Sequence, residues 1–107
     1  MKKTLVMLKK RFYSIEDLKT DIEQIMKDGS TISLKTATPD LELVIKYNEE
    51  SHMLNIKIRS CGIIIYSVDI RDLLLILYIV EVSNDNSFTS DKLDVKMFPT
   101  GDLLFSF

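Results

Sequence analysis

The chain has 107 residues, 46% of them apolar and 28% charged, which is typical of one folded globular domain and excludes a largely disordered chain. Its three glycines, Gly29, Gly62 and Gly101, lie far apart, which excludes the glycine-rich loops that bind nucleotide phosphates. A single histidine and a single cysteine exclude both an internal disulfide and a cysteine–histidine metal site.

These counts also predict a cytoplasmic protein that has no membrane segment and no cofactor. One unpaired cysteine, Cys61, is typical of a reducing compartment. The longest apolar run, Leu73–Val80, is much shorter than the roughly 20 residues needed to cross a bilayer. The apolar stretch near the N-terminus is about half as long as a secretion signal requires.

Charge is unevenly distributed, although the net charge is only −2. Five of the 14 bases lie in a basic N-terminal leader, residues 1–11, so nine bases face 16 acids in the rest of the chain. This balance favours a protein partner over nucleic acid, because phosphate binding needs cations spread over one face. The leader alone could contact phosphate, but the simpler interpretation is that its lysines keep a terminal segment soluble.

The first predicted element is a helix that begins after Ser14. Serine is a good helix cap, acids follow it in the first turn, and Asp28-Gly29 provides a stop. Apolar residues recur at the helical spacing and predict the buried face: Ile15, Leu18, Ile22, Ile25 and Met26.

After Gly29 the apolar period becomes two, which predicts strands. Alternation covers residues 32–35, 41–48 and 54–59, with a turn at Thr38-Pro39-Asp40. The short polar link at residues 48–52 predicts an antiparallel hairpin with one buried face. The β-branched run Ile63–Tyr66 does not alternate, which predicts a strand in the middle of the sheet, covered on both sides.

A second helix is predicted from Asp69-Ile70-Arg71-Asp72 onward. Residues 73–82 are apolar almost all round, so the second half of this segment fits either helix or strand, and both alternatives place it in the core. A loop at 83–87, a strand at 93–97 and a turn at 99–102 lead into a last strand, which completes a hairpin. We therefore expect one compact α+β domain over 1–107: an antiparallel sheet of about five or six strands with two helices packed on it.

The residues that most often perform catalysis give no site here. His52 and Ser51 are adjacent in one turn, whereas a nucleophile and its base must converge from separate elements, so we interpret His52 as a solvated loop residue. Acids such as Asp40, Asp85 and Asp91 show no metal-loop spacing and are typical of turns. Cys61 leads into an apolar run and is predicted to be an inert core residue. The sequence therefore predicts a protein that is not an enzyme.

Aromatic residues gather near the C-terminus, where Phe88, Phe98, Phe105 and Phe107 are four of the five phenylalanines. Phe105 and Phe107 fit a buried strand face as well as an exposed one. Phe88 follows a polar loop and is predicted to be exposed, as a binding anchor would be. Together with acids in the predicted turns, it completes the expected partner-binding set: Glu49, Glu50, Asp85, Phe88 and Asp91.

The resulting hypothesis is a non-catalytic, protein-binding inhibitor. By analogy of size and charge, we expect an immunity protein that neutralises a bacterial toxin domain, such as a nuclease, by covering a basic active site. One alternative is a phage- or plasmid-encoded inhibitor of host defence. Another is a structural or regulatory subunit that self-associates through an edge strand or through residues 73–82. A small enzyme that uses carboxylates is the least favoured alternative.

Overall fold

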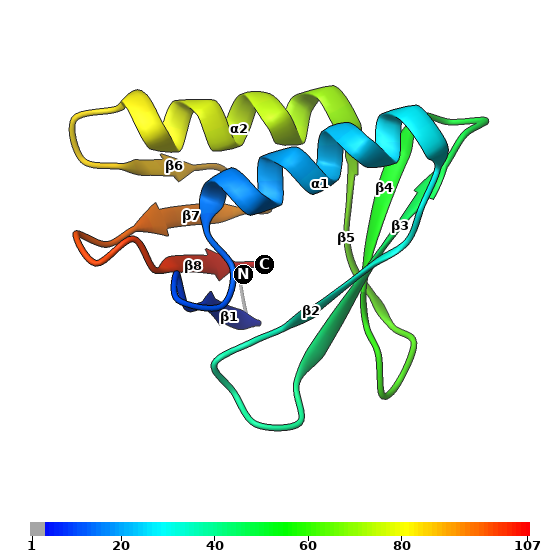
Figure 1. Cartoon of the computed structure of the whole chain (residues 1–107), viewed down its shortest axis with the longest axis horizontal. Helices are drawn as coiled ribbons and strands as arrows, with labels where there is room; N and C mark the ends of the chain where they lie inside the picture. The colour runs from blue at the N-terminus through cyan, green and yellow to red at the C-terminus, as the bar shows by residue number, and fades with distance from the viewer. Residues whose placement is uncertain (1–3) are drawn as a thin grey trace.

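A computed structural model describes residues 4–107 and shows two helices packed on eight strands (Figure 1). The helices are α1 (Ile15–Asp28) and α2 (Ile70–Val82). The strands are β1 (Leu5–Leu8), β2 (Ile32–Lys35), β3 (Glu42–Asn48), β4 (Met53–Ile58), β5 (Ile64–Asp69), β6 (Ser87–Thr89), β7 (Asp94–Met97) and β8 (Leu103–Ser106). The predicted α+β class is confirmed.

The strands form two four-stranded antiparallel sheets, so the prediction of one sheet with five or six strands was wrong. The first sheet has the order β1-β8-β7-β6, and the second has the order β2-β3-β4-β5. The two hairpins predicted from alternation, β3–β4 and β7–β8, are present. Alternation shows which side of a strand is buried, but it does not show which strands share a sheet.

β1 lies within the basic leader, where the sequence predicted only a soluble terminal segment. Val6 and Leu8 are buried, and the strand pairs antiparallel with β8. Thr4 and Phe107 extend this pairing, since each donates its amide to the carbonyl of the other. The leader is therefore part of the domain, at least from Thr4 onward.

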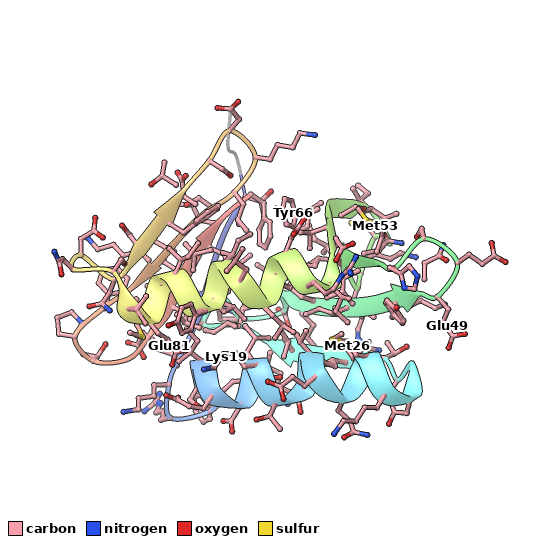
Figure 2. All side chains as sticks on the ribbon, turned by 90° about the horizontal axis from the view of Figure 1, so that it is seen from above. Lys19, Met26, Glu49, Met53, Tyr66 and Glu81 are labelled. Carbon is pink, nitrogen blue, oxygen red and sulfur yellow. The ribbon has the colours of Figure 1, made fainter. Side chains whose placement is uncertain are left out.

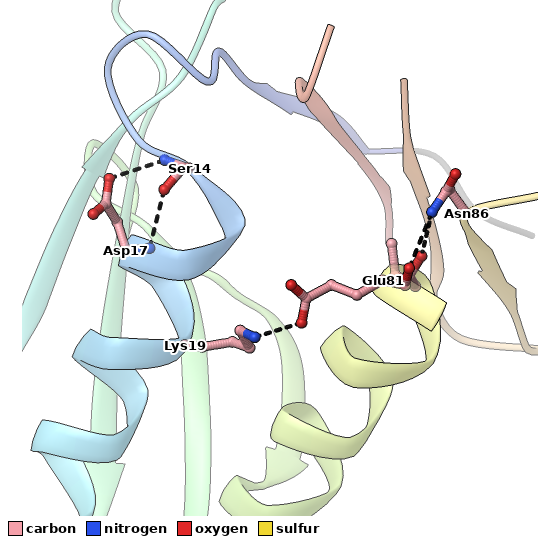
Figure 3. Close-up of polar contacts among 6 residues, drawn as sticks. Ser14, Asp17, Lys19, Glu81 and Asn86 are labelled. Carbon is pink, nitrogen blue, oxygen red and sulfur yellow. Dashed lines mark hydrogen bonds and ion pairs between the residues drawn. The ribbon is translucent and has the colours of Figure 1, made fainter. Parts of the chain in front are cut away.

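Helix α1 has the bounds that its caps predict. The Asp17 amide donates to the Ser14 hydroxyl at 3.1 Å, and the Ser14 amide donates to the Asp17 carboxylate at 3.1 Å, which completes a capping box (Figure 3). At the other end Gly29 has a φ of +67° and donates its amide to the Ile25 carbonyl. Met26 is exposed, in contrast to the predicted apolar face.

The two helices run antiparallel beside each other over the sheets (Figures 1 and 2). Lys19 of α1 and Glu81 of α2 form an ion pair that links them (Figure 3). Beneath them, an apolar core contains residues from both helices and both sheets, including Leu18, Leu73, Leu43 and Phe105. The helices therefore hold together two sheets that share few backbone contacts.

Helix α2 continues to Val82, which decides between the two alternatives for residues 73–82 in favour of helix. Asp69 caps its N-terminus and accepts a hydrogen bond from the Arg71 amide at 2.8 Å. The expectation that this whole segment lies in the core was wrong, because Leu75, Tyr78 and Val82 are exposed.

β5 is an edge strand, not the predicted middle strand. Ile63 and Ile64 are exposed, although a β-branched run without alternation is typical of a strand buried on both sides. Cys61 is exposed in the preceding turn and is not the predicted core residue. Gly62 in this turn has a φ of +67°, so the chain reverses direction just before the isoleucines and leaves them at the margin of the sheet.

Candidate protein-binding surfaces

The acids predicted to contact a partner lie in three separate loops. Glu49 and Glu50 are exposed in the β3–β4 turn, Asp85 is exposed between α2 and β6, and Asp91 is exposed between β6 and β7. Figures 1 and 2 place the β3–β4 turn and the α2–β6 loop at opposite ends of the longest axis of the molecule. These acids therefore do not form one cluster.

Phe88 does not have the exposure that the sequence predicted. It lies on β6 opposite Val95 of β7 and is partly buried against the core. Phe105 and Phe107 also belong to the core or pack against it, and their rings stack with centroids 5.8 Å apart. Phe88 is held in the sheet because its polar neighbours Ser87 and Thr89 belong to the strand and not to the loop.

His52 and Ser51 make contacts that are typical of a turn. The His52 ring nitrogen Nδ1 lies 2.9 Å from the Tyr47 hydroxyl, and the Ser51 amide donates to the Asn48 side chain. His52 itself has a φ of +59°, in the left-handed region. Within residues 4–107, no group of three or more histidine, cysteine, aspartate or glutamate side chains could hold a metal ion. The same residues contain no helix that is long and apolar enough to cross a membrane.

The outward side of α2 is an apolar surface, which we call the α2 face: Leu75, Tyr78 and Val82. These side chains are 56%, 57% and 59% exposed. Their spacing of three and four residues aligns them on one side of the helix, and the opposite side, with Leu73 and Leu77, is buried. A helix that is apolar on both sides is not explained by packing within this domain alone.

Acidic loops lie at both ends of the α2 face. At the N-terminal end, the Ile70 amide donates to the His52 carbonyl at 3.1 Å, which fixes the turn containing Glu49 and Glu50 beside the start of the helix. At the C-terminal end, the Asn86 side chain donates to the carbonyls of Val80 and Glu81 (Figure 3). This contact fixes the loop that carries Asp85.

Hydrogen bonding favours the charged form of Asp85. The Ser87 side chain hydrogen-bonds to the Asp85 carboxylate, and this contact is the main cause that lowers the pKa of Asp85 below its ordinary value. The α2 face therefore has a fixed negative charge beside its C-terminal end.

A second surface, which we call the basic hollow, lies between the β1–α1 connection and β2. Its volume is about 700 Å³. One wall contains Lys9, Arg11, Phe12 and Tyr13, and the other is formed by residues 33–37. The two walls meet where the Ala37 amide donates to the Met7 carbonyl at 2.8 Å, which is the one backbone hydrogen bond between the two sheets in residues 4–107.

The first wall of the basic hollow is fixed by polar contacts. Asp102 accepts a hydrogen bond from the Lys10 amide at 2.9 Å and forms an ion pair with Lys9 at 3.4 Å. The Tyr13 hydroxyl donates to Asp21 of α1, and burial is the main cause that raises the pKa of Tyr13 above its ordinary value.

Phe12 projects from this wall and is 72% exposed. The Arg11 guanidinium lies 4.7 Å from the centre of its ring. The cations of residues 9–11 are evident from the sequence, but Phe12, which follows them directly, was not predicted to be part of a surface. An aromatic residue beside three consecutive bases is the local signal that could have indicated this surface.

A comparison of the chain with protein-family models, curated protein sequences and solved structures found no match.

Proposed function

We propose that this protein is a non-catalytic binding protein that inhibits another protein by covering a site on it. The α2 face carries this proposal, because Leu75, Tyr78 and Val82 are more than half exposed on a rigid helix whose other side is anchored in the core. Exposed aromatic and aliphatic side chains on a rigid element are the usual anchors of protein interfaces.

A partner would stabilise the complex mainly by removing this apolar surface from water. Each fully covered aliphatic or aromatic side chain contributes about 1.5–3 kcal/mol before the entropic cost of association. Tyr78 lies between Leu75 and Val82 on the face, which is the position that contributes most in known interfaces. We expect Tyr78 to be the residue whose loss weakens binding most.

The acids at the ends of the α2 face favour a basic partner. Glu49 and Glu50 lie beyond its N-terminal end, and Asp85 lies beyond its C-terminal end. Negative charge around an apolar centre accelerates association with a positively charged surface and rejects acidic competitors. Nuclease active sites are positively charged because they bind phosphate, so an immunity protein for a nuclease toxin is the specific form that we propose.

Phe88 and Asp91 belong to the proposed contact set only if the partner extends beyond the α2 face to the first sheet. Phe88 is partly buried in β6, and Asp91 lies in the following turn. We therefore rank Glu49, Glu50 and Asp85 above them as contact residues.

A second copy of the chain is the alternative occupant of the α2 face. Two α2 helices packed antiparallel would cover the same three apolar side chains on each copy, while Arg71 is already paired with Asp69 of its own chain. The helix dipoles would also be opposed, which is favourable. This arrangement predicts a dimer before any partner is added.

The test is to co-purify the chain with the product of each adjacent gene and to measure the mass of any complex by light scattering. A one-to-one complex that is lost in Tyr78→Asp and kept in Ile63→Asp supports the proposal, because Ile63 is an equally exposed residue outside the α2 face. A chain that pairs only with itself, or a complex that Tyr78→Asp leaves intact, overturns it.

A further inference from the structure

The outer edge of β2 has backbone groups without a partner strand. β2 is the first strand of the order β2-β3-β4-β5 and pairs with β3 alone. Among residues 4–107, no backbone group of Ile32–Lys35 forms a hydrogen bond with any segment other than β3. The open edge of a sheet is a template on which another extended chain can pair.

The basic hollow runs along this edge. Five consecutive residues, 33–37, line it. Residues 33–35 belong to β2, and side chains of a strand alternate between its two faces, so a hollow bordered by all three follows the edge of the strand and not one of its faces. The Ala37–Met7 hydrogen bond closes one end of this edge. The hollow therefore has room for chain beside backbone groups that can pair with it.

The charges around the hollow specify what kind of chain would fit. Lys9 and Arg11 lie on one wall and Lys35 on the other. Lys9 is neutralised in part by Asp102, whereas Arg11 and Lys35 form no ion pair within residues 4–107. Phe12 adds an exposed ring at the same wall. Two cations that line the same hollow, neither of them in an ion pair within residues 4–107, favour an extended segment that carries carboxylates.

We propose that the basic hollow binds an extended acidic peptide segment, which adds to β2 as a fifth strand of the second sheet. Arg11 and Lys35 would pair with its carboxylates, and Phe12 would contact an apolar side chain next to them. The four residues of β2, at about 3.3 Å per residue, correspond to a bound segment of about four residues.

Single-stranded nucleic acid is the competing ligand, because lysine, arginine and an exposed aromatic ring also bind phosphates and stack on bases. A nucleic acid would leave the backbone groups along β2 unpaired, whereas a peptide would satisfy them. This difference favours the peptide and provides the means to test it. The site lies apart from the α2 face, so the two proposals stand or fall separately.

The experiment measures fluorescence anisotropy of a labelled peptide of about ten residues in which glutamate and valine alternate. We expect the wild-type chain to bind it. Lys35→Glu should weaken binding by about tenfold or more, and Lys92→Glu, an equal charge change at an exposed residue of the β6–β7 turn, should change it less than about twofold. Slower hydrogen exchange at β2 amides in the complex should accompany binding.

Two further probes separate strand addition from simple charge attraction. Two versions of the peptide are methylated on alternate backbone nitrogens, one at the odd-numbered residues and the other at the even-numbered residues. Both keep their charges, but each loses one set of hydrogen-bond donors. Because only one set faces β2, at least one of the two peptides should fail to bind. If both methylated peptides bind as tightly as the unmodified peptide, the proposal is overturned. Absence of binding by the unmodified peptide, or tighter binding of a labelled single-stranded oligonucleotide than of the peptide, also overturns it.

Discussion

The Lys19 ammonium and the Glu81 carboxylate pair across the two helices, joining the first half of α1 to the last turn of α2. Their side chains are 28% and 23% exposed, so water screens this pair less than it would a fully exposed one. The contact lies between elements far apart in the sequence. Together with the apolar core beneath the helices, it helps to hold the α2 face in place.

We predict that this pair stabilises the domain by a small but measurable amount. In a double-mutant cycle with Lys19→Ala and Glu81→Ala, the coupling free energy should be about 0.5–1 kcal/mol, because partly exposed ion pairs contribute in this range. Urea unfolding of the four proteins at low and high salt measures it. A coupling of zero at low salt would show that the two charges do not interact in solution.

Substitutions on the buried and exposed sides of α2 should differ strongly in their effect on the free energy of unfolding. Leu77 is fully buried, so Leu77→Ala should lower the free energy of unfolding by about 2–5 kcal/mol through lost burial and a cavity. Leu75→Ala removes the same atoms from an exposed position and should change stability by less than about 0.5 kcal/mol. Thermal or urea unfolding distinguishes the two, and a large loss for Leu75→Ala would mean that the α2 face is not a free surface.

The capping box of α1 should contribute separately to stability. Ser14→Ala removes the hydroxyl that accepts the Asp17 amide, and the expected cost is about 1 kcal/mol. Ser14→Asn should retain most of the stability because asparagine caps helices nearly as well as serine. Equal destabilisation by both variants, measured by urea unfolding, would contradict a capping role.

Asp102 should make the free energy of unfolding fall more steeply at acidic pH. The Lys10 amide is the main cause that lowers the pKa of Asp102 in the folded state. A carboxylate whose pKa is lower in the folded state than in the unfolded state stabilises the native state at pH values above its unfolded pKa of about 3.9. This stabilisation is lost as the pH falls through the folded-state pKa.

Asp102→Asn should therefore flatten the loss of stability below about pH 4, as measured by urea unfolding at a series of pH values. Asp91→Asn removes the same charge from an exposed turn and is the control. An acid dependence of Asp102→Asn identical to that of the wild type would rule out the contribution of the Lys10 contact.

Short-range signals predicted the local elements of this fold well. Ser14 and Gly29 set the bounds of α1, because both caps form bonds within a turn of the residues they cap. Alternation predicted the β3–β4 and β7–β8 hairpins, whose strands are close in the sequence. The helical start at Asp69 was predicted for the same reason.

Long-range pairing could not be predicted in this way. β1 was missed because its partner is at the other end of the chain, where Leu5 pairs with Ser106. The exposure of Ile63 and Ile64 depends on β5 being at an edge, which no local pattern shows. The candidate surfaces have the same limitation, since the basic hollow exists only where Arg11 of the β1–α1 connection and Lys35 of β2 line the same space.

The pairing of β1 with β8 has a consequence for synthesis on the ribosome. The strands of the second sheet occupy residues 32–69 and can pair as soon as they leave the exit tunnel, whereas β1 must wait until residues 103–106 have been translated. Until then Val6 and Leu8 have no core to enter. The first wall of the basic hollow is attached to β1, so this surface is among the last parts of the domain to be completed during translation.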